Sequence, residues 1–239
     1  PMVGAVYRLN DTDQLFASYA QNFALPAGTD DIFDNAVGFD VEAPEGEEAD
    51  NYEVGFRTNR EHYNGAVALF YTRFDNRLIA SSVINPATGQ PETFYVNAGA
   101  SKAYGIEFSG VFQPDMFDRK LYFNANVSFK KAELMDGFAG NPAGSQLPDS
   151  PEWLMTGGVT YEPTEWLVAN FSAKYTDIRY TDFNETYELE SYLVAQAYID
   201  IGGPNNFGMP ENVRLRFNVD NVFDKEVMSF GFTGSSFGR

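Results

Sequence analysis

The sequence predicts an all-β protein built from antiparallel strands that run up and down, and it favours a transmembrane barrel over a soluble sheet. Two observations carry this prediction. Apolar and polar residues alternate one for one in several stretches, which gives each predicted strand one apolar and one polar face. The connections between these stretches alternate between short and long, as they do in an up-and-down membrane barrel.

The clearest alternating stretch lies near the carboxyl end. Its apolar positions Val213, Leu215, Phe217 and Val219 alternate with the polar positions Arg214, Arg216, Asn218 and Asp220. One such strand fits either a soluble sheet with a solvated polar face or a barrel with a charged lumen. The pattern recurs over residues 121–130, 167–176 and 193–201, which are about as long as the ~9–11 residues of a membrane-spanning strand.

The alternation places ten strands along the chain. They are expected at residues 2–9, 14–23, 49–59, 64–81, 93–112, 120–132, 152–161, 165–181, 192–202 and from 212 onward. Gly, Pro, Asn and Asp gather between them, as expected of turns and loops. The short turns fall at 10–13, 60–63, 113–119, 162–164 and 203–211, and the longer connections at 24–48, 82–92, 136–151 and 182–191.

The composition excludes several classes of protein. No stretch of the 239 residues approaches the ~18 apolar residues of a membrane helix. The chain has no cysteine, so it can form neither disulfides nor thiolate sites. A net charge of −18 argues against a nucleic-acid partner, because phosphate binding needs basic patches.

Five sequence motifs, taken together, resemble one known family. They are FASYAQNF at 16–23, NYEVGFR at 51–57, YGIEFS at 104–109, LPDSPEWLMTGGVTYEP at 147–163 and FNVDNVFDKEV at 217–227. Phe70 and Tyr71, followed by Asn76 and Ile79, add a sixth match between the second and third motifs. In this order and spacing, the motifs are similar to those of the TonB-dependent outer-membrane receptors.

The resemblance implies a place in a larger molecule. Residues 1–239 would be part of one transmembrane barrel domain of 22 strands, with the plug, the first barrel half and the last strand outside this sequence. The expected location is the outer membrane of a Gram-negative bacterium. The expected partners are outer-membrane lipid, lipopolysaccharide, a small-molecule or glycan ligand, and the TonB complex of the inner membrane, acting through the plug.

The function implied by the resemblance is energised uptake of a scarce solute such as a ferric siderophore, cobalamin or a glycan. Two alternatives stay open: a passive outer-membrane porin, and a structural or adhesive surface β protein. An enzyme is not expected, because the only histidine, His62, lies in a short turn and no cysteine is present. No catalytic residue and no cofactor are therefore predicted.

The long loops are the predicted recognition surface, because ligands of a plugged barrel arrive from outside. Five loop aromatics are candidates for ligand contact: Phe33, Phe39, Phe138, Phe183 and Tyr187. The first long loop also carries a run of carboxylates without a counter-charge in the sequence. A solvated loop is the simpler interpretation, and a divalent-cation site is the sharper one, at Asp30, Asp31, Asp34, Asp40, Glu42, Glu45, Glu47 and Glu48.

The polar face of the strands is the predicted lumen wall. Eight charged residues share it: Arg57, Glu107, Lys130, Lys174, Asp200, Arg214, Arg216 and Asp220. If Ile201 lies opposite Val213, then Asp200 faces Arg214 and Tyr198 faces Arg216, since cross-strand pairs keep a constant sum of positions. Such pairs would stiffen the wall and meet a plug.

Overall fold

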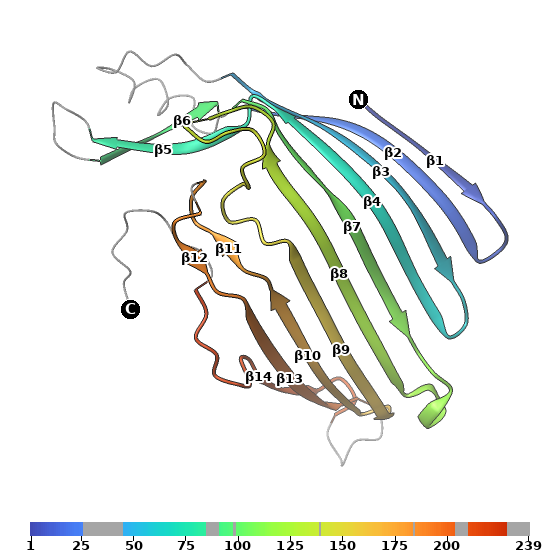
Figure 1. Cartoon of the computed structure of the whole chain (residues 1–239). Helices are drawn as coiled ribbons and strands as arrows, with labels where there is room; N and C mark the ends of the chain where they lie inside the picture. The colour runs from blue at the N-terminus through green and yellow to red at the C-terminus, as the bar shows by residue number, and fades with distance from the viewer. Residues whose placement is uncertain are drawn as a thin grey trace.

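A computed structural model describes residues 1–25, 45–84, 91–97, 99–138, 140–183, 185–203 and 210–228. Ten strands form one curved antiparallel sheet, with β1 at one edge and β14 at the other (Figure 1). In spatial order they are β1 (Met2–Arg8), β2 (Asp13–Ala24), β3 (Glu47–Asn59), β4 (Tyr63–Asp75), β7 (Ser101–Phe112), β8 (Leu121–Leu134), β9 (Trp153–Thr164), β10 (Leu167–Thr176), β13 (Tyr192–Gly202) and β14 (Arg214–Val219). The predicted all-β antiparallel fold is thereby confirmed.

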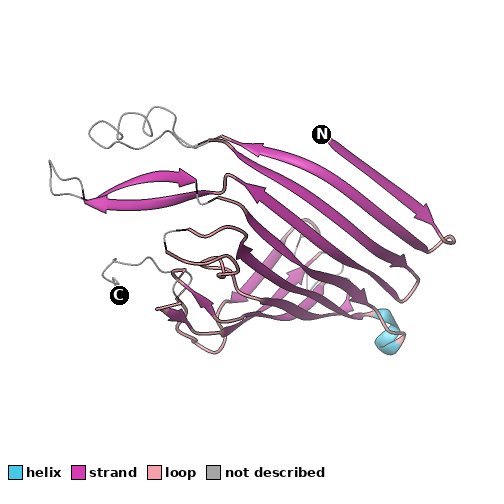
Figure 2. Ribbon diagram, turned by 45° about the horizontal axis from the view of Figure 1, so that its top comes forward, coloured by secondary structure: helices cyan, strands magenta, loops and turns pink. Residues whose placement is uncertain are grey.

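Two of the predicted long strands are broken in the structure. The strand expected at 64–81 ends at Asp75, and Asn76 then takes a left-handed φ of 55°. The strand expected at 93–112 divides near Gly99, whose φ is 77°. The outer parts, β5 (Leu78–Ile84) and β6 (Pro91–Asn97), pair with each other as a separate hairpin that extends beyond the sheet (Figure 2).

The strand expected at 165–181 is also shorter than predicted. It ends at Thr176, and β11 (Arg179–Tyr180) pairs with β12 (Glu188–Leu189) inside the following loop. At the opposite end, the turn after β7 contains a single 3₁₀ turn, η1 (Met116–Arg119). No helix in the described ranges is long and apolar enough to cross a membrane.

The register gives the sheet two chemically different faces. Directly opposed residues of an antiparallel pair project to the same face. One chain of such pairs runs across eight strands through Leu15, Phe56, Val67, Phe108, Val127, Met155, Tyr175 and Leu193. We call this side the apolar face. Phe108, near the middle of β7, is 45% exposed on this face, because no second layer covers it among the described residues.

Aromatic side chains border the apolar face at both ends of the strands. Toward the long loops, Tyr19, Tyr52, Tyr71 and Tyr104 are opposed in succession, with ring centroids 5.1 Å apart for Tyr19 and Tyr52. Toward the short turns, Phe112 and Phe123 stack at 6.4 Å. Paired aromatic borders around an apolar band are typical of barrels that sit in a bilayer.

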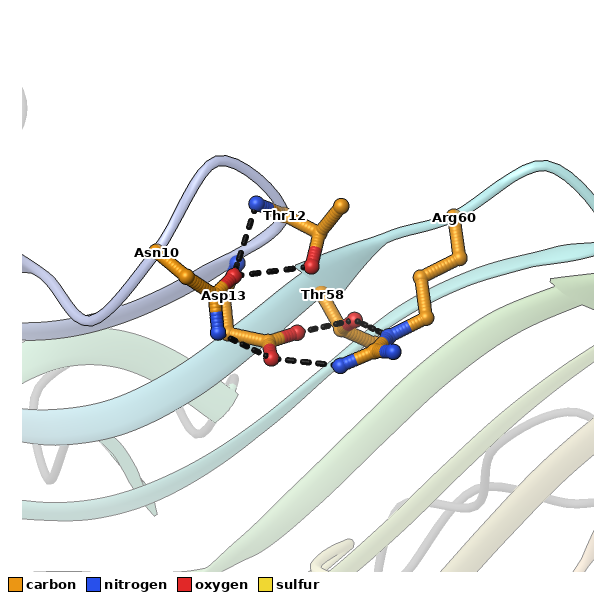
Figure 3. Close-up of polar contacts among 5 residues, drawn as sticks. All are labelled: Asn10, Thr12, Asp13, Thr58 and Arg60. Atoms are coloured by element: carbon orange, nitrogen blue, oxygen red, sulfur yellow. Dashed lines mark hydrogen bonds and ion pairs between the residues drawn. The ribbon is translucent and has the colours of Figure 1, made fainter.

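The short turn between β1 and β2 is held by a buried carboxylate (Figure 3). Asp13, only 8% exposed, accepts hydrogen bonds from Asn10 Nδ2 at 2.8 Å, Thr58 Oγ1 at 2.7 Å and Arg60 Nη2 at 2.5 Å. The Asn10 side chain in turn accepts the backbone N–H groups of Thr12 and Asp13. Because this network joins the β1–β2 turn to β3 and to the next turn, a generic Asn-Gly turn cannot reproduce it.

Acid should weaken this end of the sheet. The pKa of Asp13 is lowered from 3.8 to about 2. The largest causes are the hydrogen bonds from Thr58 and Asn10, and the hydrogen bond and positive charge of Arg60 add to them. A carboxyl with a depressed folded-state pKa stabilises the fold above its unfolded pKa, and this contribution is lost as the pH falls toward the folded value. The wild-type thermal unfolding temperature should therefore fall as the pH drops from 3.8 to about 2, and we expect Asp13→Asn to make this fall smaller.

The matched control for this experiment is Asp11→Asn, since Asp11 lies exposed in the same turn. Thermal unfolding of both variants in detergent, measured from neutral pH down to about 2, makes the comparison. Identical pH profiles for the two variants would show that the Asp13 network does not stabilise the fold.

Candidate functional site

Two loops at the long-connection end of the sheet are in direct contact. Phe138, from the loop between β8 and β9, meets Phe183, from the loop between β10 and β13, edge to face at 5.9 Å. The backbone N–H of Asp149 donates to the carbonyl of Tyr180 at 2.8 Å and joins the same two loops again. Two of the five aromatics predicted for ligand contact, Phe138 and Phe183, are therefore brought together by the fold.

A buried arginine connects these loops to a third segment. Arg179, 2% exposed, donates through Nε to Asp149 Oδ1 at 2.5 Å and through Nη2 to the carbonyl of Met228 at 2.9 Å. Its guanidinium also lies 5.7 Å from the ring centroid of Tyr192, at the start of β13. We call Phe138, Asp149, Arg179, Phe183 and Met228 the outer-loop cluster. A guanidinium suits this position because its fixed fork serves several acceptors at once.

The surroundings of the outer-loop cluster are aromatic. Burial raises the pKa of Tyr180, and the carboxylates of Glu188 and Glu185 raise it further, so its phenol stays neutral at physiological pH. Tyr187, the third predicted contact residue in the described loops, is 61% exposed and its carbonyl accepts the N–H of Thr181. The exposed ring of Tyr187 lies in the same loop as Phe183, while the rings of Phe138 and Phe183 are half-buried.

Two of the described carboxylates of the first long loop, Glu45 and Glu47, have partners. Glu47 pairs with Arg77 Nη1 at 3.0 Å and accepts the N–H of Leu78, while Glu45 accepts from Asn76 Nδ2 at 2.8 Å. Asn97 bonds the backbone of Glu45 in both directions. These contacts tie the β5–β6 hairpin to the start of β3.

The cation site proposed for that loop gains no support from Glu45, Glu47 and Glu48. No group of three or more metal-ligating side chains exists within the residues that the structure describes. The other candidates lie outside the described residues: Asp30, Asp31, Asp34, Asp40 and Glu42, together with the aromatics Phe33 and Phe39.

The predicted lumen residues share one face of the sheet. Opposed pairs lead from Arg57 across the sheet to Lys174, and another pair joins Asp200 with Arg216. Glu107, Lys130, Arg214 and Asp220 lie on the same side because side chains alternate along each strand. This polar face is opposite the apolar face. That it lines a lumen stays a prediction.

The predicted pairing of Asp200 with Arg214 is wrong by two residues. Asp200 lies opposite Arg216 and accepts two hydrogen bonds from its guanidinium, each 2.7 Å long, while Arg214 lies opposite Gly202. The predicted partner of Arg216, Tyr198, is opposite Asn218, yet its ring still lies 4.2 Å from the Arg216 guanidinium. The error arises because the sequence does not define how many residues form the turn between β13 and β14, and this number sets the register of the two strands.

His62 lies at the other end of the sheet from the outer-loop cluster. Its Nδ1 is 3.1 Å from Arg119 Nη2 and 3.6 Å from Asp115 Oδ1, so it belongs to a network of turn charges. Arg119 also binds Glu61 at 2.6 Å. This arrangement holds two short turns together.

The sequence and the fold agree with one family of proteins. A family model described as "TonB dependent receptor-like, beta-barrel" matches residues 1–222. The chain belongs to the TonB-dependent receptors. The resemblance inferred from the motifs is confirmed, and members of this family are transport receptors rather than enzymes.

Two curated relatives and one solved structure show what this TonB-dependent receptor chain is similar to. The "Probable TonB-dependent siderophore receptor PiuA" of Acinetobacter baumannii is 25% identical over 95% of this chain and 30% of the relative. The "Ferripyoverdine receptor" of Pseudomonas aeruginosa is 32% identical over 48% of this chain and 14% of the relative. The ferric yersiniabactin uptake receptor FyuA from Yersinia pestis shares the fold, with a TM-score of 0.74 and 18% identity over 98% of this chain and 34% of its own. The chain spans about a third of the length of such receptors.

Sequence reasoning missed the central residue of the outer-loop cluster. Arg179 is the only Lys or Arg between residues 177 and 191 of this receptor chain, a stretch with five carboxylates. A single cation among five carboxylates was the one feature of the sequence that could have marked Arg179 as a residue with acidic partners. Its partners Asp149 and Met228 are 30 and 49 residues away, and no local pattern connects them to it.

Proposed function

We propose that the chain forms part of the wall and the outer loops of an outer-membrane receptor that takes up a ferric siderophore in Gram-negative bacteria. The match of residues 1–222 to the receptor barrel carries the proposal, and the siderophore names of the relatives favour this solute over cobalamin or a glycan. In this proposal the residues form ten strands of a single 22-stranded barrel domain, and lipopolysaccharide surrounds its outer half.

The outer-loop cluster is proposed as part of the recognition surface. Phe138, Phe183 and Tyr187 supply aromatic area, and the Arg179 bonds hold the loops in one arrangement before a ligand arrives. Preorganised loops lose less conformational entropy on binding than mobile ones. The polar face of the sheet, with Arg57, Glu107 and Lys174 among its charges, would surround the plug through which TonB delivers energy.

Uptake of iron-55 bound to siderophores tests this function. A strain lacking the receptor gene is complemented with it, and uptake is compared with TonB present and deleted. We expect uptake of at least one ferric siderophore, lost without TonB. Equal solute entry in both backgrounds would indicate a passive porin, and no entry of any siderophore would contradict the proposed substrate class.

Deletions in the first long loop test where recognition occurs. Because Glu45 and Glu47 anchor the β5–β6 hairpin, a deletion of residues 29–47 removes both the loop and this anchor. A deletion of residues 29–44 keeps the anchor. We expect this variant to take up less siderophore and to keep the heat stability of the barrel, since long surface loops contribute little to stability. Undiminished uptake by this variant would exclude the loop from recognition.

A further inference from the structure

A groove crosses the apolar face close to the short turns. It has a volume of about 430 Å³ and lies over β3, β4, β7 and β8. Gly65, Gly110 and Ala125, which oppose one another in succession, form its floor. Phe108 stands on the side nearer the middle of the strands, and Phe112 on the side nearer the turns. We call it the outer-face groove.

The two glycines of the floor lie close to their neighbours, Gly65 to backbone and Gly110 to a side chain. A Cβ on Gly65 would lie 2.9 Å from the carbonyl oxygen of Ser109, and a Cβ on Gly110 would lie 2.9 Å from Cζ of the Phe108 ring. The Phe108 ring therefore lies down against Gly110 and shapes the hollow. Its volume falls within the ~300–1,000 Å³ of small-molecule sites, which are also mostly apolar.

The side of the groove nearest the turns leads directly to a rim of mixed charge. Tyr63 lines the groove, and the guanidinium of Arg60 lies 5.9 Å from its ring centroid. In the neighbouring turn, Arg119 pairs with Glu61 and with Asp115, whose side chains are 72% and 76% exposed. The rim therefore holds two arginines, of which Arg60 pairs with the buried Asp13 and Arg119 pairs with the two exposed carboxylates.

We propose that the outer-face groove seats an acyl chain of a zwitterionic phospholipid from the periplasmic leaflet. This inference rests on the proposed function, which places the apolar face in the outer membrane. The apolar lining matches hydrocarbon. The headgroup phosphate accepts from Nη1 of Arg60 and Nη1 of Arg119, since Nε and Nη2 of each guanidinium serve protein acceptors. The headgroup ammonium faces the exposed carboxylates of Glu61 and Asp115. An anionic headgroup lacks the ammonium, and these two carboxylates repel it.

Two substitutions of the same kind test the groove. Ala125, Gly157 and Ala173 oppose one another at one depth of the apolar face, but only Ala125 lines the groove. Leucine at residue 125 fills the floor, while leucine at residue 173 adds the same bulk outside it. The intact receptor and both variants are purified in detergent, and native mass spectrometry counts bound phosphatidylethanolamine and phosphatidylglycerol.

We expect Ala125→Leu to reduce retained phosphatidylethanolamine about tenfold, the loss that follows when roughly two methylene groups of contact are displaced. Ala173→Leu should retain it like the wild type. Equal retention by both variants overturns the groove as the site, and equal binding of phosphatidylglycerol overturns the assignment of the headgroup.

A measurement on the wild type covers the case in which Ala125→Leu fails to insert. Phosphatidylethanolamine with a photoreactive acyl chain should label peptides that contain Phe108, Phe112 or Phe123, and labelling spread equally to Phe171 contradicts the proposal. Siderophore uptake by the same receptor is measured in parallel. Specific labelling without uptake argues against the transport function alone, whereas uptake with unspecific labelling argues against the groove alone.

Discussion

Replacing Arg179 by methionine should release the three segments of the outer-loop cluster from one another. The exchange removes the bonds to Asp149 Oδ1 and to the Met228 carbonyl. Hydrogen bonds that involve a charged group are worth about 1.5–3 kcal/mol each, so local opening of these loops should increase tenfold or more. Hydrogen–deuterium exchange should become faster in residues 145–150 and 185–190, and the siderophore uptake proposed above should fall.

Two further variants make the Arg179 result specific. Arg179→Lys keeps the charge, but an ammonium on a flexible stem cannot hold both acceptors in the same geometry, so we expect an intermediate effect. Arg119→Met removes an arginine with several partners at the opposite end of the sheet and should leave the loops unchanged. If Arg179→Met exchanges hydrogen in these loops like the wild type, the cluster does not depend on this residue.

An arginine in place of Val127 should destabilise the barrel far more than one in place of its neighbour Ser128. Val127 lies near the middle of β8, on the apolar face between Phe108 and Met155. A cation at the bilayer midplane costs ~2–4 kcal/mol on this side of a barrel. An arginine at residue 128 would instead project from the polar face, where Glu107 is the directly opposed residue.

The heat-dependent gel shift of the intact receptor measures this difference. Ser128→Arg should keep the folded band to nearly the wild-type temperature, and Val127→Arg should lose it at a lower temperature or fail to insert. Equal loss in both variants would contradict the assignment of the two faces, and greater loss for Ser128→Arg would reverse it.

The strand pattern made the faces and the order of the sheet predictable. Alternation fixes which residues share a face, and the eight charged residues from Arg57 to Asp220 do share one, although their place in a lumen stays a prediction. The breaks at Asn76 and Gly99 were not predictable in this way. The chain leaves the sheet at these two residues but continues as the strands of the β5–β6 hairpin. Because both sides of each break are strands, the sequence keeps a strand-like pattern and does not reveal where the sheet ends.

The candidate site was predictable only in its parts. Loop position and aromatic character selected Phe138 and Phe183, but their mutual contact depends on how two loops 45 residues apart fold back over the sheet. The same holds for Arg179 and Asp149. Contacts between loops leave no periodic trace in a sequence, because each loop follows its own path between strand ends.

The opposition of Gly202 and Arg214 explains how the last two strands avoid slipping. A shift of one residue would exchange the faces, but a shift of two keeps every apolar residue on its side, so alternation alone cannot prevent it. Such a shift would place Asp200 opposite Arg214, and this second arginine could donate hydrogen bonds to it in place of Arg216. A Cβ at residue 202 would collide with the Val213 carbonyl oxygen, so the close approach of β14 at this point admits only glycine. In the shifted alignment Asp200 would occupy the position opposite Arg214, where its side chain would not fit. The absence of a side chain at Gly202 thereby selects one of two alignments that are equally amphipathic.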